Sequence, residues 1–144
     1  MSVPRVVRVL GHPLHAILSD FPLALVCPSI FWDAIGVWRH EPLWWAISFW
    51  TIALGLASAL VTAAAGLADY AAIPEKDPAA STATCHMAVM LTAVCLYAAS
   101  LIVRRTAAPP EGAKLMAAFL LEGFGFLSLG AGGWLAGISF FITA

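Results

Sequence analysis

Titratable side chains gather in a short segment near the start of the chain, GHPLHAILSDFP at residues 11–22. His12 and His15 are three positions apart, so they lie on the same side of the chain if the segment is helical. Asp20 stands two positions before Pro22, a pattern that suits the N-cap of a helix with proline in its first turn, but it could also orient a histidine. Because imidazole is a common ligand of haem iron and of metal ions, the segment predicts a binding site.

The elements that must position these residues are membrane-spanning helices. Hydrophobic residues make up 62% of the 144-residue chain and charged residues 10%, a composition far outside the range of a soluble domain. A spanning helix needs about 20 mostly apolar residues, and four stretches are long enough, near 17–38, 43–70, 84–103 and 113–142. The apolar residues do not alternate with period two, which argues against a membrane barrel. The sequence therefore predicts an all-α fold with a single integral-membrane domain over residues 1–144.

Short polar connections at 39–42, 74–81 and 104–112 predict a four-helix up-down bundle, in which consecutive helices are antiparallel. In such a bundle the starts of the first and third helices lie at the same membrane face as the ends of the second and fourth. If the segment before Asp20 is a separate interfacial helix, it lies at that face too. The rule gathers three histidines and two aspartates there, together with four other residues: His12, His15, Asp20, Asp69, His86, Tyr70, Cys85, Met87 and Trp134.

Two further acidic residues lie inside the predicted spans. Asp33 is near the opposite face, and Glu122 lies about 13 Å below that face at a rise of about 1.5 Å per residue. A bare charge at such depth is costly. One interpretation is that both acids are neutral and hydrogen-bonded within the bundle, and the other is that they have a function.

Histidines from two helices at one depth fit one haem b with two histidine ligands, His86 on one side and His15 or His12 on the other. The first and third helices lie diagonally across an up-down bundle, so these rings would face each other, with Asp20 or Asp69 fixing their tautomers. We therefore expect electron transfer with a quinone or a redox partner. Three alternatives remain open: a zinc, iron or copper ion on His12, His15 and His86, a quinone or proton-relay site on the same cluster, and a structural accessory subunit of a membrane complex.

Several motifs resemble those of a family of bacterial integral membrane proteins known as domain of unknown function 2231. They are GHPLHAILSDFPLAL at 11–25, FWDAIG at 31–36, AGLADYAAIP at 65–74, TCHMA at 84–88 and GGWLAG at 132–137. The resemblance covers nearly the whole chain and implies a four-helix protein of the bacterial inner membrane. The polar signature of the family falls here on His12, His15, Asp20, Asp33, Asp69 and His86.

The expected partners follow from the same observations. The lipid bilayer surrounds the helices, a quinone or redox protein would exchange electrons, and further copies of the chain could form a homo-oligomer. No basic surface suited to nucleic acid is visible in the sequence. No Ser/His/Asp or Cys/His arrangement for nucleophilic catalysis is visible either, which argues against an enzyme of soluble substrates.

Overall fold

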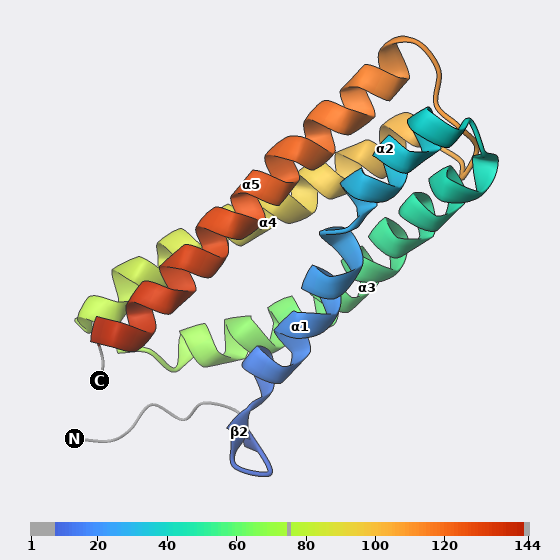
Figure 1. The fold of residues 1–144 in the computed structure, drawn as a ribbon. Helices are drawn as coiled ribbons and strands as arrows, with labels where there is room; N and C mark the ends of the chain where they lie inside the picture. The colour runs from blue at the N-terminus through green and yellow to red at the C-terminus, as the bar shows by residue number, and fades with distance from the viewer. Residues whose placement is uncertain (1–7, 75, 143–144) are drawn as a thin grey trace.

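The computed structural model describes residues 8–74 and 76–142, and it confirms the all-α membrane class. Four helical stretches are long and apolar enough to cross a membrane: Leu14–Arg39, Pro42–Ala71, Ala79–Arg104 and Ala113–Gly137. They lie over the four predicted stretches, with ends that differ by a few residues. Figure 1 shows them running up and down in turn, as predicted.

The first spanning stretch consists of two helices, α1 (Leu14–Val26) and α2 (Ser29–Arg39). The break lies at Cys27 and Pro28, because proline has no backbone N–H with which to continue the helical ladder. The Ser29 hydroxyl donates a 2.8 Å hydrogen bond to the carbonyl oxygen of Val26 across the break. The chain therefore interrupts a helix within a predicted membrane span, which the sequence analysis did not anticipate.

A small hairpin precedes α1, formed by β1 (Arg8–Val9) and β2 (His12–Pro13). Its two turn residues, Leu10 and Gly11, have φ angles of 51° and 84°, as a two-residue turn between antiparallel strands requires. The prediction of an interfacial helix beginning before His15 is therefore wrong at its start. Asp20 is an exposed residue inside α1 and not an N-cap.

The remaining spans are the helices α3 (Pro42–Ala71), α4 (Pro78–Arg104) and α5 (Ala113–Ile142). Proline occupies the first position of both α3 and α4, where the missing N–H would have no partner inside the helix. The carboxylate of Asp77 caps α4 by accepting a 2.9 Å hydrogen bond from the backbone N–H of Ala79.

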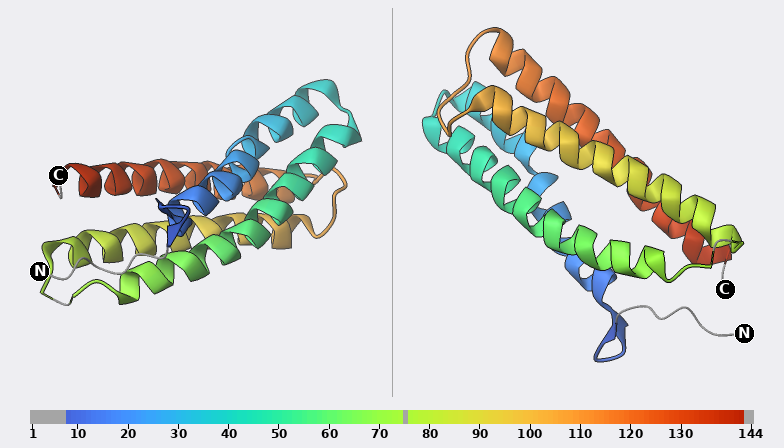
Figure 2. Two further views of the ribbon diagram at one scale, coloured as in Figure 1. Left: turned by 90° about the horizontal axis from the view of Figure 1, so that it is seen from below. Right: turned by 180° about the vertical axis from the view of Figure 1, so that it is seen from behind.

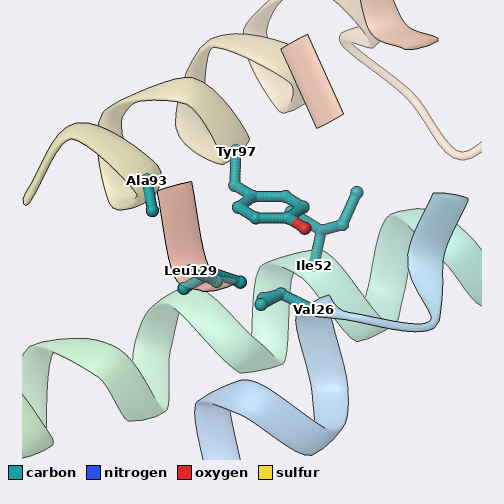
Figure 3. Packing of buried hydrophobic residues seen from close by; sticks show 5 residues of the cluster. All are labelled: Val26, Ile52, Ala93, Tyr97 and Leu129. Atoms are coloured by element: carbon teal, nitrogen blue, oxygen red, sulfur yellow. The ribbon is translucent and has the colours of Figure 1, made fainter. Parts of the chain in front are cut away.

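The helices pack as two groups, α1 and α2 along α3, and α4 along α5 (Figures 1 and 2). Contacts of α3 with α4 and of α2 with α5 join the groups. Five buried side chains from all four spans form the central apolar cluster in Figure 3: Val26, Ile52, Ala93, Tyr97 and Leu129. Figure 1 and the right-hand view of Figure 2 show the first turn of α1 well apart from the first turn of α4. The predicted diagonal pairing of these helix starts is therefore not formed.

Candidate functional site

The three histidines predicted to share one site lie in separate surroundings. His12 is exposed in the terminal hairpin. His15 on α1 donates its Nδ1–H to the carbonyl oxygen of Thr62 on α3, at 3.0 Å, and His86 on α4 donates its Nδ1–H to the carbonyl oxygen of Gly132 on α5, at 2.9 Å. Each half-buried imidazole thus joins two neighbouring helices, and the two rings belong to different helix pairs.

The two carboxylates predicted to orient those histidines lie on different helices and do not bring the three histidines together. Asp20 is exposed in the middle of α1, and Asp69 is half-buried near the end of α3. Within residues 8–74 and 76–142, no group of three or more His, Cys, Asp or Glu side chains is arranged to hold a metal ion. The predicted function, a haem or metal redox site on this cluster, is therefore wrong. The binding roles assigned individually to His12, His15, Asp20, Asp69 and His86 stay predictions.

A different set of polar side chains meets inside the bundle, around the guanidinium of Arg104. Asp33 on α2, Arg104 at the end of α4 and Glu122 on α5 are all buried, with Asp33 and Glu122 fully so. Three fully buried serines from α2, α3 and α4 surround them: Ser29, Ser48 and Ser100. We call these six residues the buried charge cluster.

Arg104 is the centre of the buried charge cluster. Its Nη1 donates to Asp33 Oδ1 at 3.0 Å and its Nη2 donates to Asp33 Oδ2, so the guanidinium grips that carboxylate with two nitrogens. The same Nη2 donates to Glu122 Oε1, and Nε donates to Ser100 Oγ at 3.2 Å. The indole of Trp45 stacks against the guanidinium, 5.9 Å from carbon to ring centroid, which adds a cation–π attraction.

The position of Arg104 explains why the sequence analysis missed it. It was counted with the third connection, but it is the last residue of α4. Side chains on a helix point toward the N-terminus, so the last residue of a spanning helix can turn back into the bundle. The two acids were recognised as intramembrane groups, while the cation that joins them was assigned to the surface.

Glu122 lies against the helix break of the first span. Its Oε1 accepts a 2.9 Å hydrogen bond from Ser100 Oγ, and its Oε2 is 3.0 Å from Ser29 Oγ. Ser29 is the first residue of α2, so Glu122 also lies near the positive end of that helix dipole. Every oxygen of the Glu122 carboxyl group therefore has a polar neighbour in the buried charge cluster.

A surface pocket of about 250 Å³ is lined by Trp45, the residue whose indole also stacks against Arg104. Its lining includes Gly36, His40 and Trp45, together with Pro109 and Pro110 from the connection before α5. A Cβ atom on Gly36 would lie 2.8 Å from Cε2 of Trp45, so the glycine lets the indole approach α2 closely. The same side chain therefore lines this pocket and contacts the guanidinium of Arg104.

Comparison with known proteins gives a family but no characterised relative. A family model described as predicted membrane protein, DUF2231, matches residues 11–139. No curated protein and no solved structure matches the chain.

Proposed function

The chain belongs to the DUF2231 family of predicted membrane proteins, and we propose that it binds one exchangeable proton inside the bilayer, on Glu122 of the buried charge cluster. The function that follows is proton-coupled membrane transport, in which binding and release of a proton at a buried acid is the elementary step. The observation that carries the proposal is the burial of two acids with one base, Asp33 and Glu122 with Arg104.

The charge of the cluster favours a bound proton. Two carboxylates and one guanidinium sum to a net charge of −1, since −1 − 1 + 1 = −1. A net charge inside a membrane bundle is costly to hold. One proton makes the cluster neutral without moving any residue. The residues that the structure describes place no second lysine or arginine in a salt bridge with either acid.

The single hydrogen of the Ser29 hydroxyl also favours a proton on Glu122. Its Oγ lies 2.8 Å from the carbonyl oxygen of Val26 and 3.0 Å from Glu122 Oε2. A hydroxyl has one hydrogen, so it can donate to only one of these two oxygens. If Glu122 carries a proton on Oε2, that O–H donates to Ser29, and Ser29 donates to Val26. All three groups are then satisfied.

The same geometry favours Glu122 over Asp33 as the site of the proton. Both oxygens of Asp33 accept from the guanidinium of Arg104, the paired arrangement that suits a charged carboxylate. Only Oε1 of Glu122 accepts from Arg104. Oε2 faces a hydroxyl that can accept, so it is the oxygen able to hold a hydrogen.

Exchange requires that the proton can enter and leave. The broken first span is typical of membrane transporters, whose substrate and ion sites lie at discontinuous helices. The pocket lined by His40 and Trp45 supports access from that face, because the Trp45 indole also contacts Arg104. A bacterial inner membrane, the predicted location, maintains the proton gradient that such a protein would use. A quinone, a redox protein and further copies of the chain stay predictions, and the proton site requires none of them.

The test is infrared spectroscopy of the protein in lipid, combined with proton flux into liposomes. We expect a carbonyl stretching band of a protonated carboxylic acid, which disappears in Glu122→Gln and is unchanged in Glu111→Gln, an exposed acid of the connection before α5. Liposomes with the protein should dissipate an imposed pH gradient faster than those with Glu122→Gln. A spectrum without that band, or equal flux for the two proteins, contradicts the proposal.

A further inference from the structure

The buried hydroxyl of Tyr97 is the one polar side-chain group in the described chain that is buried and has no hydrogen-bond partner. Tyr97 is 1% exposed and belongs to the central apolar cluster. Leaving such a group unpaired costs free energy comparable with a lost hydrogen bond. Buried polar groups in native structures are therefore paired with protein atoms or with ordered water.

Figure 3 shows where this hydroxyl lies. The ring extends from α4 across the bundle, and its oxygen ends beside Ile52 of α3 and Val26 at the end of α1. Gly125 on α5 holds the ring from the other side, because a Cβ there would be 2.8 Å from Cε2 of the tyrosine. The phenol is thus fixed with its oxygen toward the break between α1 and α2.

Polar groups suited to a water molecule lie around this point. Ser29 Oγ lies 2.8 Å from the carbonyl oxygen of Val26 and 3.0 Å from Glu122 Oε2, and Val26 packs in the same cluster as Tyr97. A buried water needs two to four polar partners. The phenol can donate to such a water or accept from it, and the oxygens of Ser29 and Glu122 can accept from it while their hydrogens bond to Val26 and Ser29.

We infer that Tyr97 binds one water molecule at the helix break, and that this water is the group with which the Glu122 proton exchanges on the inner side of the cluster. The exchange is balanced: the carboxylic acid gives its hydrogen to the water and receives one of the water's hydrogens in return. The inference rests on the proposed proton site for its second part only. Binding of the water follows from the unpaired phenol alone.

Binding of the water is tested by Raman spectroscopy of the tyrosine ring, whose bands report hydrogen bonding of the phenol. The chain has two tyrosines, so Tyr70→Phe leaves Tyr97 as the sole source of the signal. The Tyr70 hydroxyl forms an exposed hydrogen bond with Thr84, and Tyr70 is not part of the buried charge cluster. We expect a hydrogen-bonded phenol in this variant, and still in Tyr70→Phe/Ser29→Ala. An unbonded phenol in Tyr70→Phe overturns the inference, because the phenol would then have no partner. Loss of the hydrogen bond in Tyr70→Phe/Ser29→Ala also overturns it, because the partner would then be Ser29 itself.

The exchange step is tested by transferring the protein in lipid from H₂O to D₂O and following the carboxylic acid band of Glu122. Tyr97→Phe keeps the ring and removes the hydroxyl, so exchange should slow by about tenfold, equivalent to about 1.4 kcal/mol in barrier height. Phe49→Leu, which removes an aromatic ring from α3, serves as the control. Its carboxylic acid band should exchange at the rate of the unmodified protein. Unchanged exchange in Tyr97→Phe overturns this part. If the unmodified protein has no carboxylic acid band, the proposed function fails, while the Raman result still decides the water.

Discussion

Arg104→Met removes the cation from the buried charge cluster and keeps an unbranched side chain at the end of α4. Asp33 then loses both of its guanidinium hydrogen bonds, and Glu122 loses one. With Glu122 protonated, the cluster changes from neutral to a net charge of −1, fully buried. Removing one partner of a buried ion pair costs about 3–5 kcal/mol, so we expect the free energy of unfolding to fall by about that amount.

The assay is reversible unfolding in mixed micelles, followed by helical circular dichroism, for Arg104→Met and for the double variant Arg104→Met/Asp33→Asn. The double variant is neutral again if Glu122 carries a proton, so it should recover most of the lost stability although it has the same methionine. Replacement of a whole buried ion pair by neutral groups is often close to neutral in free energy. A loss below about 1 kcal/mol in the single variant would refute the argument. A double variant no more stable than the single one would show that packing, and not charge, sets the cost.

Two further predictions concern packing and capping. Gly36→Ala places a Cβ 2.8 Å from Trp45 Cε2 and should lower the free energy of unfolding by about 1–3 kcal/mol through overpacking. The control is Gly133→Ala, which has nothing within 4 Å of its Cβ and should not lower the free energy of unfolding in the same assay. Asp77→Ala removes the cap that accepts from the Ala79 N–H and should cost about 0.5–2 kcal/mol, while Asp77→Asn should retain most of the stability. Equal stability of the alanine and asparagine variants would show that the cap contributes nothing.

The spanning helices could be predicted because their signals are local. Length and apolar composition define a membrane span, and Pro42 and Pro78 mark two helix starts by lacking a backbone N–H. The family resemblance found in the motifs was confirmed by the match over residues 11–139. The start of α1 was less predictable, because Gly11 permits a hairpin turn that the helical spacing of His12 and His15 does not reveal.

The structure does not bring His15 and His86 together, because depth in the membrane does not specify which helices are neighbours. His15 and His86 were placed at one level and assumed to face each other. In the fold each ring bonds to a carbonyl oxygen of its own neighbouring helix, Thr62 on α3 and Gly132 on α5. Which helices pair depends on close contacts such as Gly55 against Val26. Such contacts are set by side chains far apart in the sequence.

The sequence by itself determined that this protein spans a membrane four times and that Asp33 and Glu122 lie within the spans, since hydropathy and helix-breaking residues act over a few neighbouring positions. Only the tertiary structure decided that Arg104 turns inward to join those acids, that three serines complete the cluster, and that Tyr97 points its hydroxyl at the broken helix. The physical reason is that a charge in the bilayer is tolerated only with its partners, and those partners come from separate helices that meet only when the bundle has packed.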